Sequence, residues 1–333
     1  MSGAFELFTV ARSGGARTDL TQLTRALQWS GDYRTAARRL DFALLQTAFD
    51  PRQPALPAAV GDGAELLLDG ESVFSGVILD KGEDTLSYDS TRIAFDWGVY
   101  LRQNGDYLRV ANQTPEEITR WLGTVCGFGL GEIAETGVRV SRNFLPGDYF
   151  TIIKTMYSLA GAVTGKSYAI RFRGLTMDVV EQVRTAESVL LEPGSNLLSC
   201  KSRDSAQSVV NLVKVYDDAY NLAFSEEDAA SQALYGLFQA AILSSAYDDP
   251  AAEAKRILAD GALSTTLICE CLGSRRLITG GTAVVHEPTT NTYGLFHIAA
   301  DAHTWEKGLY RTTVELSLKD LVSEREAAEC AKE

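Results

Sequence analysis

Gly63-Ala-Glu-Leu-Leu-Leu-Asp-Gly-Glu-Ser-Val-Phe-Ser-Gly76 reads as a glycine, an apolar run, a polar turn and a second glycine that opens a new apolar run. Gly281-Thr-Ala-Val-Val-His-Glu-Pro-Thr-Thr-Asn-Thr-Tyr-Gly294 repeats this layout, with the same 13-residue spacing between its glycines. Both patterns are typical of β-hairpins, and a longer β-like run follows each, at Thr91–Trp97 and Tyr310–Leu318. The repeat predicts one barrel-like β unit that is used twice, with other material between the copies.

The size and charge of the chain limit its organisation and its partners. A chain of 333 residues exceeds one ordinary hydrophobic core, so we expect two or three domains. The net charge of −13 argues against non-specific binding to duplex DNA, which requires Lys and Arg to displace counterions. The acidity is explained by solubility, or alternatively by a surface or lumen that must repel nucleic acid.

The start of the chain and its cysteines favour a reducing compartment. Met1–Glu6 lacks the basic start and apolar run of a signal peptide, and no stretch approaches the length of a membrane span. Cys269-Glu-Cys271 lies in an alternating run, so we expect two buried thiols on one face and no zinc site. The cysteines are odd in number and scattered, which fits a cytoplasm: Cys126, Cys200, Cys269, Cys271 and Cys330.

Residues 1–107 are predicted to form the first β-barrel domain. Short apolar runs separated by Gly, Asp and Pro indicate strands. These runs are Phe5–Val10, Leu23–Ser30, Leu40–Leu45, Leu66–Leu68, Val73–Leu79 and Ile93–Leu101.

Residues 108–186 are predicted to form an α/β domain. Thr114-Pro-Glu-Glu117 has the pattern of a capping box and begins a helix that Gly127 and Gly129 end. A second helix follows Pro146-Gly-Asp148, and a strand pair turns at Arg173-Gly174. The predicted fold class is therefore α+β, mainly β.

Residues 187–321 are predicted to form the second β-barrel domain, with strands at Leu197–Lys201 and Ser208–Tyr216. A helical insert at 225–261 interrupts it and ends in a helix with Asp249 as its cap and Pro250 in its first turn. We expect this insert to lie outside the barrel and to pack on it or on a neighbouring subunit. The charged tail 322–333 is predicted to be frayed or helical.

Ala160-Gly-Ala-Val-Thr-Gly-Lys-Ser167 matches a relaxed phosphate-loop pattern. A phosphate loop needs a strand before it and a helix after it, so that the helix N-terminus faces the phosphate. Here an amphipathic helix precedes the segment and a strand follows it. The pattern therefore favours the C-terminal cap of a helix.

The three histidines, His286, His297 and His303, have no metal-ligand spacing and are interpreted as structural residues. No nucleophile elbow occurs, and no cysteine has a readable histidine partner. Paired acids for glycoside hydrolysis stay open, since nothing distinguishes any pair among 44 Asp and Glu residues. We predict no catalytic, cofactor-binding or metal-binding residues, and no enzyme.

Three groups of segments, taken in order, cover nearly the whole chain and carry a resemblance to a known family. They are Trp29–Phe42, then Asn211–Tyr216 with Tyr235–Gln239 and the Ala-rich helix 250–260, then Tyr293–Ile298 through His303–Trp305 to Thr312–Leu316. Together they resemble the baseplate hub proteins of contractile phage tails, the XkdQ-like and late-control-protein-D-like group. The resemblance implies two tube-protein-like β-barrels with an α/β domain between them. Trp29, Phe42 and Trp305 are interpreted as barrel core in preference to an interface.

The resemblance also implies a function, partners and a location. It implies a structural homotrimer in the virion tail baseplate, made in the host bacterial cytoplasm, that adapts the six-fold tail tube to the three-fold central spike. Two barrels per chain would give a ring of six that alternate around a channel, through which DNA passes without specific binding. Its partners would be the tube protein, the spike, other baseplate proteins and the tape measure protein. The alternatives are a tail-associated cell-wall hydrolase and a carbohydrate-binding module.

Overall fold

The computed structural model describes residues 4–12, 14–15, 17–45, 56–83, 89–181, 188–246 and 250–317. The predicted tail 322–333, Cys330 and the predicted helix cap Asp249 lie outside the described residues. None of the helices in the described ranges is long and apolar enough to cross a bilayer.

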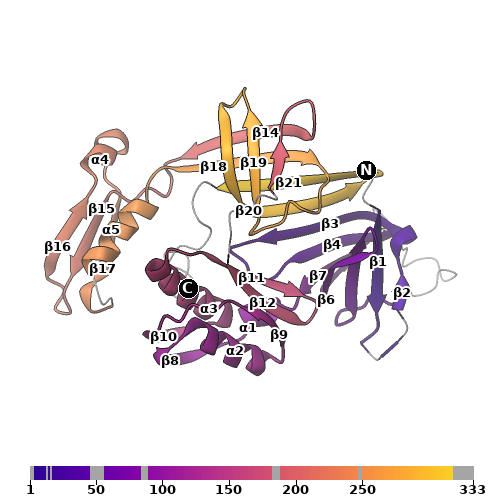
Figure 1. Ribbon diagram of the computed structural model, residues 1–333, viewed down its shortest axis with the longest axis horizontal. Helices are drawn as coiled ribbons and strands as arrows, with labels where there is room; N and C mark the ends of the chain where they lie inside the picture. The colour runs from indigo at the N-terminus through magenta and orange to yellow at the C-terminus, as the bar shows by residue number, and fades with distance from the viewer. Residues whose placement is uncertain are drawn as a thin grey trace. The chain divides into compact units, whose positions relative to one another are not determined.

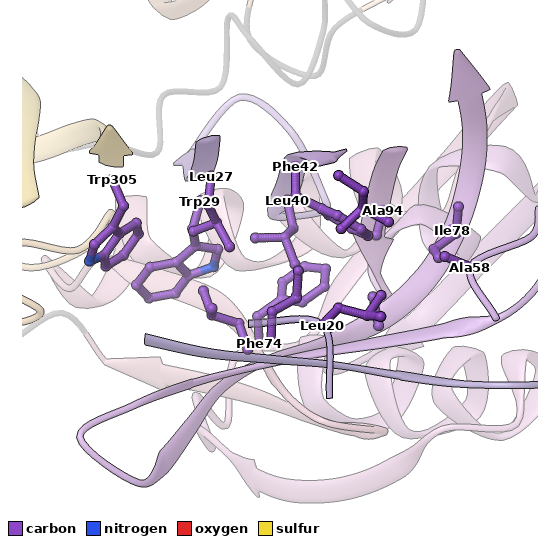
Figure 2. Close-up of a cluster of buried hydrophobic side chains, with 14 of the residues drawn as sticks. Leu20, Leu27, Trp29, Leu40, Phe42, Ala58, Phe74, Ile78, Ala94 and Trp305 are labelled. Carbon is purple, nitrogen blue, oxygen red and sulfur yellow. The ribbon is translucent and has the colours of Figure 1, made fainter. Parts of the chain in front are cut away.

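The first β unit contains the expected strands, and alternate residues along them are buried. On β4 the buried positions are Leu40, Phe42 and Leu44, and they join a core that Figure 2 shows in close-up. The strands are β1 (Phe5–Val10), β2 (Arg17–Asp19), β3 (Thr24–Asp32), β4 (Arg39–Leu45), β5 (Gly63–Leu68), β6 (Glu71–Glu83) and β7 (Asp89–Asp96), with a 3₁₀ turn at Thr21–Leu23.

One strand of this unit ends earlier than we expected. The apolar run Ile93–Leu101 predicts a strand throughout, but β7 ends at Asp96. The Asp96 carboxylate accepts a hydrogen bond of 2.9 Å from the Gly98 amide, which turns the chain into the short helix α1 (Val99–Gln103).

The α/β region follows with its own core. Helix α2 (Pro115–Cys126) has the predicted capping box at Thr114 and ends at Gly127 in the left-handed conformation. Because Leu101 of α1 packs in this core, the core begins before the predicted boundary at 108. The other elements are β8 (Gly105–Gln113), β9 (Gly129–Ile133), β10 (Val140–Asp148), α3 (Tyr149–Thr164), β11 (Tyr168–Arg173) and β12 (Thr176–Glu181).

Residues 201–267 form a compact unit of their own. The helical insert expected at 225–261 contains two helices but also strand β17 and the end of β16. Strand β15 was expected to continue the second barrel, but its hydrogen-bonding partners are β16 and β17, and α5 closes a small core of Val213, Val215, Ile242 and Ala254. The elements are β15 (Leu212–Tyr216), β16 (Leu222–Glu227), α4 (Ala229–Tyr235), β17 (Gln239–Leu243), a 3₁₀ turn at Ser244–Ala246, and α5 (Pro250–Asp260).

The second β unit repeats the strand order of the first. Its strands are β13 (Val189–Leu191), β14 (Leu197–Ser205), β18 (Ser264–Leu272), β19 (Thr282–Glu287), β20 (Thr292–Glu306) and β21 (Leu309–Ser317). The order β3-β4-β7-β6-β5 in the first unit matches β14-β18-β21-β20-β19 in the second. The predicted repeat of a β unit is therefore confirmed, and the fold is mainly β with an α/β region between the repeats.

The glycines that suggested the repeat do not occupy equivalent positions. Gly76 pairs with Ala64, far from the two-residue turn that closes the first hairpin. Gly294 pairs with Val285, close to a longer turn at 288–291. The equal glycine spacing thus hides a shift in register, because the two turns differ in length.

A shared β-bulge gives the true alignment of the repeats. The pairing of β6 with β7 shifts between Ile78 and Asp80, and the pairing of β20 with β21 shifts between Ile298 and Ala300. The Ile78 carbonyl accepts from the Gly61 amide, and the Ile298 carbonyl accepts from the Gly280 amide. Ile78 therefore corresponds to Ile298. Because both repeats have the bulge and the same contacts beside it, β6 and β20 are equivalent strands.

Candidate assembly site at the junction of the two β units

The two β units join within one sheet. Strand β20 is long enough to have two neighbours along one edge, so that its first part pairs with β19 and its last part with β3 (Figure 1). In the β3 pairing, Ala300 lies opposite Asp32 and Glu306 lies opposite Ala26. This antiparallel ladder makes a continuous sheet from two repeats of the same unit.

Apolar side chains from both units meet at this junction. Trp305 of β20 is 7% exposed and belongs to the core of the first unit, beside Trp29 (Figure 2). Its ring stacks on Tyr310 with a centroid separation of 4.3 Å and meets the edge of Phe5 at 5.9 Å. The interpretation of Trp29, Phe42 and Trp305 as core residues is confirmed.

An ion pair between a buried carboxylate and a partly buried guanidinium crosses the same junction. Arg38 follows β3, and its guanidinium donates two hydrogen bonds, of 2.9 and 2.5 Å, to the carboxylate of Asp301 on β20. Asp301 is 3% exposed and also accepts from the amide and hydroxyl of Thr279, each at 2.6 Å. Burial alone would raise the pKa of Asp301, but the Arg38 charge and the His303 contact hold it well below its usual range.

His303 completes this network as a structural residue. It is fully buried, its Nε2 lies 3.2 Å from the Asp301 carboxylate, and its Nδ1 lies 2.8 Å from the Tyr310 hydroxyl. Its ring also packs on Trp29 at 4.8 Å. The network fixes the two β units by polar contacts as well as by apolar packing.

A cavity of about 500 Å³ opens beside the junction. Aromatic residues line part of it, including Trp29, Tyr33 and Phe150. Its lining contains six cations and three acids, the reverse of the balance in the whole chain. The cations are Arg38, Lys154, Arg171, Arg173, Arg275 and Arg276, and the acids are Asp32, Glu71 and Asp96. Three of these cations already have carboxylate partners: Arg38 pairs with Asp301, Arg173 with Asp178 and Arg275 with Glu71.

Asp96 in this cavity should make stability depend on pH. Burial raises the pKa of Asp96 to about 7, so the folded state binds its proton more tightly than the unfolded state does. The contribution of Asp96 to stability is then most favourable at low pH and becomes less favourable as the pH rises from about 4 to about 7. Asp96→Asn cannot ionise and can still accept from the Gly98 amide.

We expect Asp96→Asn to increase the free energy of unfolding by about 2–4 kcal/mol at about pH 8 and to change it little at about pH 4. Urea denaturation followed by tryptophan fluorescence at both pH values measures this difference. An effect of equal size at the two pH values would contradict the assignment of the raised pKa to Asp96.

The segment that resembles a phosphate loop forms the C-terminal cap of a helix, as predicted. Its first part is the end of α3, and Gly165 caps the helix in the left-handed conformation. Strand β11 then begins at Tyr168, and Lys166 donates to Glu181 at 2.8 Å. A helix therefore precedes this loop and a strand follows it, the reverse of the order in a phosphate loop.

The two thiols of the second β unit are buried on one face of β18, as predicted. Cys269 lies 3.4 Å from Cys200, and Cys271 donates to the Thr312 carbonyl. Burial raises the pKa of both thiols, that of Cys271 to about 12.

His286 is exposed near Tyr293, whereas His297 is buried. Among the described residues, no group of three or more His, Cys, Asp or Glu is placed to hold a metal ion.

Sequence reasoning missed Arg38, Asp96 and Asp301, although one signal was present. Asp301 and His303 stand four and two residues before Trp305, in the buried phase of an alternating strand. A carboxylate in that phase requires a buried partner. Nothing in the sequence identifies Arg38 as that partner, because the two residues meet only through the pairing of β3 with β20.

This architecture is the fold of phage tail proteins. It is similar to the 43 kDa tail protein of prophage MuSo2 from Shewanella oneidensis, with 12% identity, a TM-score of 0.72 and coverage of 95% of this chain and 99% of that chain. It is also similar to the tail protein from Neisseria meningitidis MC58, with 14% identity, a TM-score of 0.68 and coverage of 97% and 99%.

A third similar structure comes from a bacterial secretion system. It is an Escherichia coli component of the type VI secretion system, described as similar to the T4 tail proteins gp27 and gp5. The identity is 11%, the TM-score is 0.51, and the match covers 90% of this chain and 77% of that chain.

The sequence itself assigns the family. Residues 27–319 match the YQBQ-like family, so the chain belongs to it. No curated protein sequence matches the chain. The family match and the tail-protein fold together confirm the resemblance to baseplate hub proteins.

Proposed function

We propose that this chain is the structural hub of a contractile tail baseplate or a tail-like injection particle. In this proposal three copies form a ring that joins the six-fold tail tube to the three-fold central spike. The observation that carries the proposal is the pairing of β3 with β20, which joins two equivalent β units side by side within one chain. Three such pairs supply six units, and a closed ring of three chains then matches both symmetries.

The proposed partners are the tube protein on one face and the spike on the other, with further baseplate proteins and the tape measure protein. DNA would pass through the channel of the ring without specific binding, and the net charge of −13 favours a wall that does not retain it. The hub would act by assembly and not by catalysis. The tail-protein fold of its structural neighbours supports this role.

Two measurements test the proposal. Native mass spectrometry of the purified chain should detect a trimer, and electron microscopy of particles with the labelled chain should place it between tube and spike. Peptidoglycan zymography is expected to give no cleared band. A chain found along the tail sheath, or a cleared band that disappears on mutation of a single acid, would overturn the proposal.

A further inference from the structure

Strand β6 has an edge that is open where its counterpart in the second unit is filled. Ile78 corresponds to Ile298, so Asp80–Glu83 corresponds to the start of the part of β20 that pairs with β3. Strand β5 pairs with β6 only as far as Val77. In the part of the chain that the structure describes, no strand pairs with Asp80–Glu83 on the edge opposite β7.

The counterpart of β3 is also open on its outer edge. Strand β14 corresponds to β3 and is the last strand of the large sheet. Among the described strands, β3 pairs with β4 on one side and β20 on the other, whereas β14 pairs with β18 alone. The chain therefore contains a counterpart of β3, which is β14, and a counterpart of β20, which is β6. These two counterparts do not pair with each other within the chain.

Facing side chains align β14 with β3. Cys200 contacts Cys269 across β14 and β18, as Leu27 pairs with Phe42 across β3 and β4. A bulge in the β3 pairing shifts the register between Thr24 and Ala26. The pairing of β14 with β18 has an equivalent shift of one residue. It lies between the Cys200–Cys269 contact and the hydrogen bond from the Leu272 amide to the Asn196 carbonyl. Cys200 thus corresponds to Leu27, and Asp204 corresponds to Gly31.

We propose that β14 of one copy pairs antiparallel with the Asp80–Glu83 segment of β6 in the next copy, in the register of β3 with β20. The partner is a second copy of this chain, and the inference rests on the proposed ring. In the β3–β20 ladder Asp301 lies opposite Gly31. The equivalent residues are Lys81 and Asp204, which would lie directly opposite each other between copies.

The charges and exposure of the two edges suit this pairing. Opposite charges across a ladder stabilise it. Lys81 would face Asp204, and Asp80 would lie diagonal to Arg203 on the other face of the sheet. All four side chains are exposed in the single chain. Open strand edges of this kind are templates for pairing with another chain.

The test uses a one-to-one mixture of ¹⁴N-labelled and ¹⁵N-labelled full-length chain. A zero-length carbodiimide should join the Lys81 amine to the Asp204 carboxylate, and a peptide pair of mixed isotopes identifies the link as one between copies. Within one chain Lys81 also lies 2.6 Å from Glu83, so a link between these two residues is expected but carries one isotope only.

Charge reversal adds a second readout. Lys81→Glu and Asp204→Lys should each abolish the trimer at concentrations at which the unsubstituted chain is fully trimeric, and the double variant Lys81→Glu/Asp204→Lys should restore it. Lys307→Glu is the matched control, since Lys307 is 89% exposed in the β20–β21 turn and should leave the trimer unchanged.

The outcomes separate this inference from the proposed function. A trimer without the mixed-isotope link and unaffected by either charge reversal overturns the edge pairing and leaves the ring in place. A chain that stays monomeric, and is absent from the tail, overturns the ring itself. If Lys81→Glu formed larger open-ended assemblies, Lys81 would be a residue that prevents the open edge of β6 from pairing with other chains. That result would also overturn the proposed pairing.

Discussion

Replacing Asp301 by Ala is expected to lower the free energy of unfolding by about 3–5 kcal/mol, because removal of one partner leaves a buried charge without compensation. The Arg38 guanidinium would lose both of its hydrogen bonds to the carboxylate, and the Thr279 amide would lose its acceptor. Chemical denaturation of the purified chain near neutral pH measures the loss.

The pH dependence of this variant identifies the carboxylate as the cause. The folded pKa of Asp301 is depressed, so its contribution is present above the unfolded value of about 4 and is lost as the pH falls toward the folded value. The stability difference between Asp301→Ala and the unsubstituted chain should therefore shrink only below about pH 4.

A surface ion pair supplies the control for Asp301. Lys166 and Glu181 are 2.8 Å apart, with both side chains well exposed. Glu181→Gln should therefore change the free energy of unfolding by no more than about 1 kcal/mol. If Asp301→Ala cost as little as this control does, the ion pair would not hold the two β units together.

Replacing Trp305 by Ala is the second large effect, with an expected loss of about 3–5 kcal/mol. Trp305 is carried by the second β unit but is buried in the core of the first, against Phe5 and Tyr310. The substitution leaves a cavity at the junction that the rigid ladder of β3 and β20 cannot collapse to fill. Thermal and urea denaturation report the loss.

Trp121 provides the matched control for Trp305. It lies on helix α2 and is 46% exposed, so Trp121→Ala should alter stability by less than about 0.5 kcal/mol. Equal losses for the two substitutions would show that Trp305 is not the apolar anchor of the junction.

Much of the fold could be predicted from the sequence because local patterns control it. The capping box at Thr114, the turn at Gly174 and the alternation on β4 act within a few residues, and all three form as predicted. The repeat was also detectable, since hairpins have local turn signals. The two hairpins lie on equivalent strands, β5 with β6 and β19 with β20, but their glycines do not align. Turn length sets the register, and a spacing of glycines contains no information on turn length.

The junction and the small unit could not be predicted in this way. Alternation in β15 indicates a half-buried strand but not which sheet the strand joins, so its pairing with β17 was missed. Arg38 and Asp301 are 263 residues apart and meet only after the long-range pairing of β3 with β20 forms. The contacts that define the candidate site are therefore properties of the tertiary fold.

The chain between β14 and β18 contains β15, β16, α4, β17 and α5, whereas the first repeat has only a short link between β3 and β4. The two repeats thus share a strand order, but only the second has an inserted unit between its first two strands in that order, β14 and β18. In a ring of alternating units, only every second unit would bear this appendage. In the proposed ring, the insertion in one repeat would divide six positions of shared strand order into two distinguishable sets of three, without altering the sheet that joins the two repeats.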